Sequence, residues 1–358
     1  MALPHGRPAH PGLLDGFGRV ATDLRVSLTD RCNLRCSYCM PEEGLAWLPS
    51  ERVLTDDEVV RLVTVAVERL GVTELRFTGG EPLLRRGLEQ IVAATTSLRT
   101  AQGLAPETSL TTNAVGLARR AAGLAAAGLG RVNVSLDTLD PVRFAAITHR
   151  DRHADVLAGL RAAADAGLGP VKVNAVLLRG VNDAEAGALL RWSLREGYAL
   201  RFIEQMPLEP HGTWDRTSMI DVDDVLRLVA DDFAPGALEL HQQEPAERGA
   251  APAELWDVRW DDGAVVRTGT LGVIGSVTRP FCSACDRTRL TADGEVRDCL
   301  FATRGHDLRG MLRDGAGDDE LADAWRTAMW GKLAGHGLDD LAGAGFARPD
   351  RPMSAIGG

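Results

Sequence analysis

Between residues 24 and 205 the sequence alternates six times between a short apolar stretch and a longer stretch with helical periodicity. Strands separated by helices pair in parallel through right-handed crossovers. We therefore predict an α/β fold, an incomplete TIM-like (β/α)6 barrel whose functional groups lie at the carboxyl ends of its strands. The expected strands are residues 24–29, 74–78, 108–112, 131–137, 171–177 and 199–205.

An open doubly wound sheet is the alternative for such a repeat. Its glycine-rich turn is missing after the first strand, where cysteines follow instead. The expected helices span residues 54–71, 87–98, 115–127, 141–148, 154–166 and 183–196, and Thr55 and Glu58 form a T-x-x-E capping box at the start of the first.

The alternation stops after Met206. A helix at 221–230 and short strands at 238–243, 254–260 and 264–274 indicate a smaller C-terminal α+β lobe. Without further alternation, this lobe is expected to cap the open side of the barrel rather than extend it. The predicted organisation is a flexible N-terminal lead-in at 1–19, a partial barrel at 20–207 and a C-terminal region at 208–358.

The first of two cysteine triplets, Cys32, Cys36 and Cys39, follows the first strand with C-x3-C-x2-C spacing. Three thiolates bind three irons of a [4Fe-4S] cluster and leave the fourth open to a small molecule. A zinc knuckle is the alternative, but zinc prefers four ligands and this loop contains no fourth. Disulfides are disfavoured, because the chain is large and shows no export signal.

The second triplet, Cys282, Cys285 and Cys299, has C-x2-C-x13-C spacing and predicts another three-cysteine cluster. A zinc site completed by a distant histidine such as His306 is the alternative. Arg287 and Arg289 lie between these cysteines, and on a strand their side chains share one face. Two guanidinium groups beside an open cluster suit phosphate oxygens. A solvated surface pair is the usual interpretation of such arginines, but their position between the cysteines favours a functional role.

The formal net charge of −10 over 358 residues argues against general nucleic-acid binding but allows a phosphorylated small molecule in a local basic pocket. No apolar run reaches the ~18 residues of a membrane span, so we expect a cytoplasmic protein. The terminal Gly357-Gly358 is either a free end or a peptide that enters the active site.

The first triplet resembles the signature of the radical S-adenosylmethionine (SAM) enzymes. Gly79-Gly80-Glu81-Pro82, Thr111-Thr112-Asn113, residues 133–137 (NVSLD), the second triplet and the final Gly-Gly narrow the resemblance to the MoaA-type GTP 3',8-cyclase family. The resemblance covers residues 17–358. One departure is Ala114, where the family usually has glycine.

This resemblance implies a lyase with two [4Fe-4S] clusters, one at each triplet. It implies that Tyr38, Gly80, Ser135 and Met206 bind SAM. It also implies that GTP contacts Arg25, Arg76, Thr111, Lys172, Arg287, Thr288 and Arg289, with Arg25, Arg287 and Arg289 as catalytic residues. From the residues alone, Arg76 and Lys172 lie on predicted strands and can point into the barrel, where cations suit a triphosphate.

The implied reaction is the first step of molybdenum cofactor biosynthesis, from GTP to (8S)-3',8-cyclo-7,8-dihydroguanosine 5'-triphosphate. A 5'-deoxyadenosyl radical abstracts the ribose C3' hydrogen, and C3' attacks guanine C8. Implied partners are an electron donor and a downstream cyclic pyranopterin monophosphate synthase, for a monomer or homodimer without nucleic acid or membrane. The alternatives are a radical SAM peptide maturase and a non-catalytic metal-binding scaffold.

Overall fold

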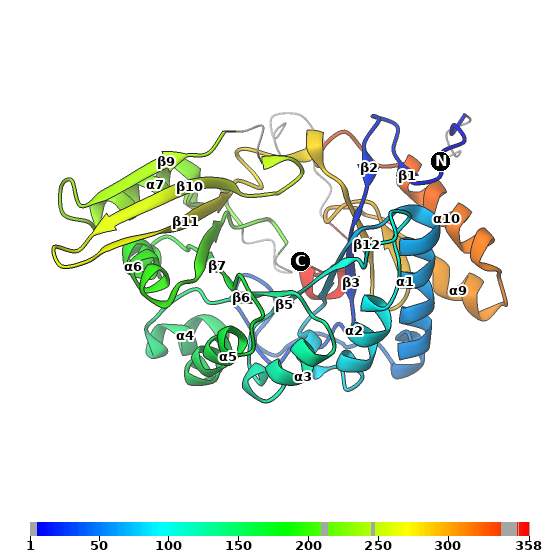
Figure 1. The fold of residues 1–358 in the computed structure, drawn as a ribbon, viewed down its shortest axis with the longest axis horizontal. Helices are drawn as coiled ribbons and strands as arrows, with labels where there is room; N and C mark the ends of the chain where they lie inside the picture. Colours follow the sequence, from blue (N-terminus) through cyan, green and yellow to red (C-terminus); the bar gives the residue numbers. More distant parts are fainter. Residues whose placement is uncertain (1–5, 209–213, 245–247, 338–348, 350, 358) are drawn as a thin grey trace.

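Six parallel strands, hydrogen-bonded in sequence order, form the centre of the molecule (Figure 1). The structure is a computed structural model that describes residues 6–208, 214–244, 248–337, 349 and 351–357. The predicted (β/α)6 core is confirmed, with each strand within two residues of its expected ends. The strands are β3 (Asp23–Ser27), β4 (Glu74–Thr78), β5 (Glu107–Thr112), β6 (Arg131–Ser135), β7 (Lys172–Val176) and β8 (Ala199–Ile203).

Helices cover the outer face of this sheet (Figure 1). They are α1 (Asp56–Leu70), α2 (Leu88–Thr96), α3 (Ala121–Ala126), α4 (Pro141–Thr148), α5 (His153–Asp165) and α6 (Ala186–Glu196). The predicted capping box is present, because Glu58 N donates to Thr55 Oγ1 at 3.2 Å and Thr55 N donates to Glu58 Oε2 at 2.8 Å. These bonds satisfy amide groups that lack partners within the helix.

The helix expected at 115–127 is divided into a 3-10 turn, Leu117–Arg119, and α3. Arg120 lies between them with φ of −114°, outside the usual helical range. Its guanidinium donates to the carbonyl oxygens of Leu83 and Arg85 and pairs with Glu89. The local pattern could not reveal these contacts with a loop more than thirty residues away.

The C-terminal region extends the sheet at both edges, contrary to expectation. β11 (Val266–Ile274) pairs in parallel with β8, and β12 (Arg287–Leu290) pairs in parallel with β3. Strands delivered by hairpins and loops, rather than by β-α units, therefore occupy the seventh and eighth parallel positions. Among the described residues, β11 and β12 are not paired with each other, so the sheet remains open between them.

Antiparallel strands complete both ends of the sheet. β9 (Leu238–Gln242) and β10 (Glu254–Asp261) follow α7 (Val222–Asp231) and lead into β11, forming an arm at the left of Figure 1. At the other end, the predicted Asp293-Gly294 turn joins β12 to β13 (Glu295–Arg297), which pairs with β14 (His306–Asp307). α9 (Leu308–Arg313) and α10 (Asp318–Trp330) follow.

The segment expected to be a free lead-in is packed against the molecule from Gly12 onward. β1 (Leu13–Leu14) pairs with β2 (Val20–Ala21) and contacts α10, and Leu13 is fully buried. Leu13 and α10 belong to the same continuous core as the barrel strands. The prediction of a flexible lead-in is therefore wrong for this stretch, because burial of Leu13 favours the packed state. Residues 1–5 lie outside the described residues.

The last described helix, α11 (Met353–Ile356), lies inside the curve of the sheet, beside the strand ends (Figure 1). Ile356 is fully buried. None of the helices in the described part of the chain is both long and apolar enough to cross a membrane.

Candidate active site

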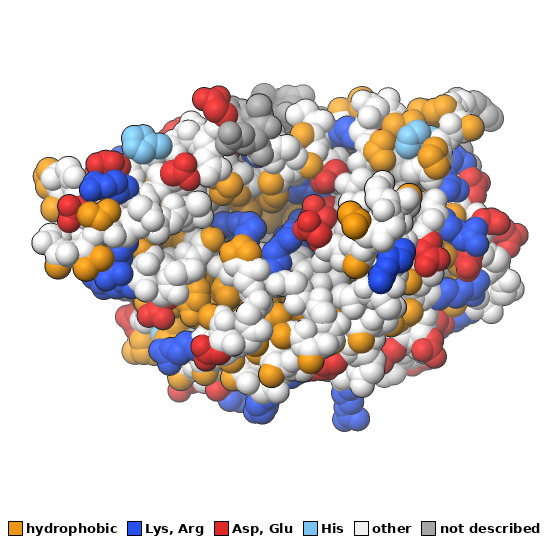
Figure 2. Space-filling view, viewed as in Figure 1, with side chains coloured by type: hydrophobic (Ala, Val, Ile, Leu, Met, Phe, Trp, Pro, Cys, Tyr) orange, Lys and Arg blue, Asp and Glu red, His pale blue; other side chains and the backbone are white. Residues whose placement is uncertain are grey.

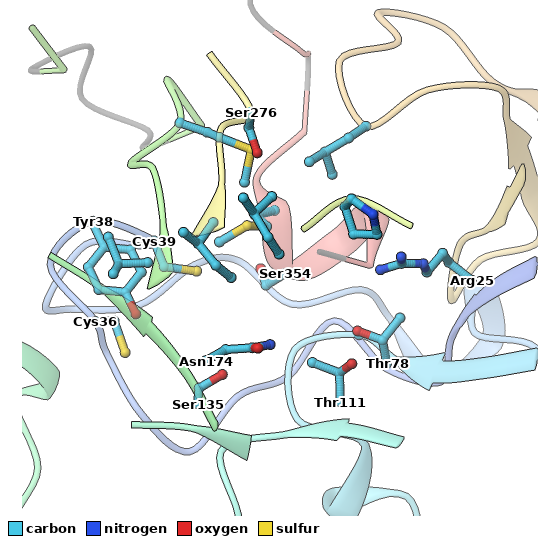
Figure 3. A pocket seen from close by; sticks show the side chains of 18 of the residues that line it. Arg25, Cys36, Tyr38, Cys39, Thr78, Thr111, Ser135, Asn174, Ser276 and Ser354 are labelled. Carbon is cyan, nitrogen blue, oxygen red and sulfur yellow. The ribbon is translucent and has the colours of Figure 1, made fainter. Parts of the chain in front are cut away.

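Both cysteine triplets line one cavity of about 310 Å³ at the carboxyl ends of the parallel strands. Figure 2 shows the hollow, with basic side chains at its edge, and Figure 3 shows its interior. Most residues expected in the site line this cavity, namely Arg25, Tyr38, Arg76, Gly80, Thr111, Ser135, Met206, Arg287, Arg289 and the six cysteines.

Lys172 and Thr288 do not line the cavity. Lys172 lies on β7 two residues before Asn174, which does line it, so the two side chains share a face of the sheet. Thr288 lies on the opposite face of β12 from Arg287 and Arg289. Its Oγ1 accepts a 3.0 Å hydrogen bond from Trp325 Nε1 on α10, so its side chain joins β12 to this helix.

The thiols of the first triplet suit a cationic metal cluster. Burial raises the pKa of Cys32 to about 11 and that of Cys39 to about 12, and the neighbouring Cys32 adds to the effect at Cys39. The pKa of Cys36 is also raised, by burial and by Asp137. Such thiols ionise when a metal supplies compensating charge, and three soft donors on one cavity wall match an iron–sulfur cluster.

Tyr38 is fixed beside this triplet by a buried carboxyl group. Its hydroxyl donates to Asp137 Oδ2 at 2.7 Å, and Val176 N donates to Asp137 Oδ1 at 2.9 Å. Burial raises the pKa of Asp137 to about 6, despite both hydrogen bonds. Asp137 lies at the end of the NVSLD stretch, but its contact with Tyr38 joins positions 99 residues apart and had no local signal.

Gly79 and Gly80 permit close packing of two loops. A Cβ atom on Gly79 would lie 2.3 Å from Thr29 O, and one on Gly80 would lie 2.3 Å from Arg31 O. Hydrogen bonds hold the loops together, from Gly80 N to Thr29 O and from Glu81 N to Arg31 O, each 2.7 Å long. The glycine pair therefore sets the position of the backbone that leads into the first cysteines.

Glu81 joins this loop to the Thr111-Thr112-Asn113 segment. Its fully buried carboxyl group accepts from Thr112 Oγ1 at 2.7 Å, Asn113 N at 2.7 Å and Leu83 N at 2.9 Å. Burial raises its pKa to about 7, against the effect of these donors. Asn113 Nδ2 in turn donates to Asn33 Oδ1 at 2.7 Å, beside Cys32. One carboxyl group thus organises three loops around the first triplet.

Ala114, the departure from the family pattern, has φ of +61°. This is the left-handed region, in which a glycine is less strained than alanine. Ala114 is fully buried and follows Asn113, so the network around Glu81 holds it in place. The departure leaves the positions of Thr111, Thr112 and Asn113 intact.

The second triplet has a different electrostatic setting. Burial acts to raise the pKa of the Cys285 thiol, but Arg287 and Lys332 outweigh it and lower that pKa. His306, the alternative zinc ligand, is exposed on β14 and does not line the cavity. His336, which the sequence did not single out, does line it, and its Nε2 lies 2.9 Å from Ser276 O.

Five arginines of the described part of the chain line the cavity, and of these the sequence analysis missed Arg201 on β8. Burial lowers the pKa of Arg76 to about 9 and that of Arg201 to about 10, and neighbouring arginines add to the effect. The buried Asp23 lies 3.4 Å from Arg25 and 3.8 Å from Arg76. Asp137 and Asp298 also line the cavity, but the arginines still outnumber the carboxyl groups, and the excess positive charge suits a polyanionic ligand.

The C-terminal tail enters the same site. Met353 and Ser354 line the cavity, and Arg289 donates a hydrogen bond to the carbonyl oxygen of Gly357. Gly357 has φ of +72°, and a Cβ atom there would lie 2.6 Å from Ser27 Oγ. Of the two interpretations of the terminal glycines, the structure favours the inserted peptide. Gly358 lies outside the described residues.

Comparisons with known proteins agree with this architecture. The radical SAM superfamily model matches residues 26–193, and the Molybdenum Cofactor Synthesis C model matches residues 198–338. A Streptomyces coelicolor protein named GTP 3',8-cyclase is 60% identical over 346 residues, which are 97% of this chain and 96% of that protein. A Mycobacterium marinum protein of the same name is 58% identical, over 100% of this chain and 95% of its own.

Among solved structures, SuiB of Streptococcus suis bound to S-adenosylmethionine is similar in fold. The TM-score is 0.52 and the sequence identity 13%, and the match covers 92% of this chain and 76% of SuiB. At this identity the likeness concerns the fold alone.

Proposed function

Because the chain belongs to the GTP 3',8-cyclase family of radical SAM proteins, we propose that it is a lyase that converts GTP to (8S)-3',8-cyclo-7,8-dihydroguanosine 5'-triphosphate, the first step of molybdenum cofactor biosynthesis. The observation that carries this proposal is the shared cavity. Two three-cysteine sets and five arginines line one chamber, so a radical source and a nucleotide can meet there.

Cys32, Cys36 and Cys39 would bind the cluster that holds SAM, and Cys282, Cys285 and Cys299 would bind a second [4Fe-4S] cluster. When bound, the first cluster and SAM supply a 5'-deoxyadenosyl radical for hydrogen abstraction at the ribose C3'. The donor chemistry of both triplets supports this assignment.

The protein's own residues orient the reactants. We assign Tyr38, Gly80, Ser135 and Met206 to SAM binding. The hydrogen bond to Asp137 holds Tyr38 in place for this role. The cavity arginines would bind the triphosphate through bidentate hydrogen bonds, with Lys172 adding positive charge. Thr111 and Thr288 remain proposed GTP contacts, and for Thr288 the contact would be through its backbone. Proximity of C3' to C8 then makes ring closure efficient.

The reaction requires electrons, so an electron donor is a necessary partner. The cyclised nucleotide would pass to a cyclic pyranopterin monophosphate synthase. The division at residue 207 and a monomeric or homodimeric state remain predictions.

The test is anaerobic incubation of the reconstituted protein with SAM, a reductant and GTP. We expect about eight irons per chain, as two [4Fe-4S] clusters require, together with 5'-deoxyadenosine and the 3',8-cyclised nucleotide. Release of 5'-deoxyadenosine without cyclised nucleotide would favour a peptide maturase or another radical SAM activity. Tightly bound zinc without SAM cleavage would favour a non-catalytic scaffold.

Arg287 and Arg289 provide a sharper version of this test. We expect Arg287→Ala and Arg289→Ala to lose most cyclisation while keeping iron content, because the arginines would bind substrate rather than metal. Arg259→Ala, on the exposed face of β10, is the matched control and should cyclise normally. An unchanged cyclisation rate in both cavity variants would remove these arginines from the mechanism.

A further inference from the structure

Lysine is almost absent from this chain. Among 40 lysine and arginine residues only two are lysines, Lys172 and Lys332. Arginine therefore serves nearly every ordinary cationic role, on the surface and in ion pairs. A compact ammonium differs from a planar guanidinium in size, hydration and donor geometry. The two positions that carry lysine are therefore candidates for roles that arginine does not fill.

Lys332 is buried behind the second triplet and does not line the cavity. Its side chain is 4% exposed, and its Nζ atom donates to Cys285 Sγ at 3.3 Å, Cys285 O at 3.3 Å and Arg287 O at 2.8 Å. All three ammonium donors are thus directed to the segment that carries the second triplet. Because it is away from the cavity wall, Lys332 is not placed to contact the substrate.

The surrounding structure fixes this lysine. Lys332 N donates to Met329 O at 3.1 Å, which continues the last turn of α10. The helix itself is joined to β12 by the Trp325–Thr288 hydrogen bond. Arg19 donates to the carbonyl oxygens of Leu333 and Ala334, the two residues that follow Lys332, and also to that of Cys282. The ammonium is therefore held at the sulfur by contacts on both sides.

We propose that Lys332 is a positioning residue that raises the reduction potential of a [4Fe-4S] cluster bound by Cys282, Cys285 and Cys299. This inference rests on the second cluster of the proposed function. A cluster with three thiolates becomes more negative on reduction, and a hydrogen-bonded cation at one sulfur stabilises that form. Lys332 also fixes the carbonyl groups of Cys285 and Arg287, and so the start of the strand that carries Arg289.

The experiment isolates the second cluster by replacing Cys32, Cys36 and Cys39 with alanine in the full chain. This parent protein is reconstituted anaerobically, and about four irons per chain are expected. The midpoint potential is then measured by redox titration with electron paramagnetic resonance, for the parent and for Lys332→Met, Lys332→Arg and Arg326→Gln. Arg326 lies on α10 and, among the described residues, donates to the backbone carbonyl groups of Pro11 and Arg69, so it controls for loss of a cation from this helix.

We expect Lys332→Met to keep its iron and to lower the ratio of reduced to oxidised cluster about tenfold at a fixed poise. A tenfold change is the effect expected from one hydrogen bond to a charged group. For a one-electron couple it corresponds to a shift of about 59 mV in the midpoint potential. Lys332→Arg should lie closer to the parent because it keeps the charge, and Arg326→Gln should match the parent.

Two outcomes would overturn the inference while the second cluster stands. One is an unchanged potential in Lys332→Met with full iron content. The other is loss of iron in Lys332→Met, since the lysine would then act in cluster assembly rather than on its potential. A parent protein without iron would instead refute the second cluster itself, and this inference with it.

Discussion

Burial and neighbouring charges shift the pKa values of the charged side chains around the cavity. Asp23 shows the balance most clearly: burial acts to raise its pKa, but Arg25, Arg76, Arg287 and Arg289 together lower it. The single charge of Asp23 is shared among these four arginines, so it reduces their mutual repulsion without neutralising them. The remaining charge would be compensated by the triphosphate, which makes ligand binding sensitive to the protonation of the weakest cation.

The cation with the lowest pKa beside the cavity is Lys172 on β7. Burial and the neighbouring Arg201 lower its pKa to about 8. As pH rises through this value the ammonium loses its proton, whereas binding of a triphosphate favours the protonated form. GTP affinity should therefore be highest below pH 8 and fall above it, by at most about tenfold per pH unit. Equilibrium dialysis with GTP at pH 7 and pH 9 measures this change.

Lys172→Arg and Lys172→Met separate charge from shape. The arginine variant keeps its charge at position 172 up to pH 9, so its GTP affinity should fall less between pH 7 and pH 9 than that of the wild type. The methionine variant should bind weakly at both values. A wild-type affinity that is equal at pH 7 and pH 9 would show that Lys172 does not contact the phosphates.

At the residue scale, the sequence was sufficient where a strand pattern was clear. Arg76 was expected to point into the barrel because it lies on a predicted strand, and it lines the cavity. Arg201 carried the same signal on β8 and could have been found. Asp137 and Lys332 could not, because their partners Tyr38 and Cys285 are set by long-range packing rather than by spacing.

At the scale of elements, the site depends on contact between loops. Gly80→Ala should destabilise the protein by about 1–3 kcal/mol or more, because the added Cβ meets only backbone atoms, 2.3 Å from Arg31 O and 2.5 Å from Asp30 O. It should also weaken SAM binding, since the loop would move away from the first triplet. Urea unfolding and SAM titration measure the two effects.

Gly16→Ala is the matched control for Gly80→Ala. A Cβ atom there would have only one neighbour, Trp330 O at 3.7 Å, which is ordinary contact. If Gly80→Ala had the same stability in urea and the same affinity for SAM as this control, the close approach of the two loops would be dispensable.

The inserted tail gives a second prediction at this scale. Deletion of Gly357-Gly358 removes the carbonyl group to which Arg289 donates, and Gly357→Ala introduces a clash with Ser27 in a strained conformation. We expect both changes to abolish cyclisation and to leave iron content unchanged. Product formation and iron analysis measure these outcomes.

Ala355→Ser, within α11 and partly exposed, is the control for the tail and should remain active. Normal turnover after the two-residue deletion would show that the tail occupies the cavity without a role in the reaction. The sequence offered two interpretations of these glycines because nothing local to a chain end specifies what it contacts.

At the scale of the whole molecule, the two family-matched regions share one sheet. The sequence predicted the strand at 264–274 correctly, but not its parallel pairing with β8, because periodicity identifies a strand and not its neighbour. The same applies to β12, which joins β3 across more than 260 residues of sequence. The C-terminal region therefore supplies both the second triplet and the strands that cover both edges of the six-stranded core.

A chain truncated after residue 207 should therefore fail to fold as an independent barrel. It would leave the edges of β3 and β8 without partners and would expose the apolar side chains that β11 and β12 cover, such as Leu24 and Leu200. Unpaired strand edges promote association between chains. We expect aggregation in size-exclusion chromatography and no cooperative thermal transition by circular dichroism. Co-expression with residues 208–358 should restore a soluble complex, because the missing strands are then supplied by the second chain. If the truncated chain alone were monomeric and unfolded cooperatively, the first region would be an independent domain.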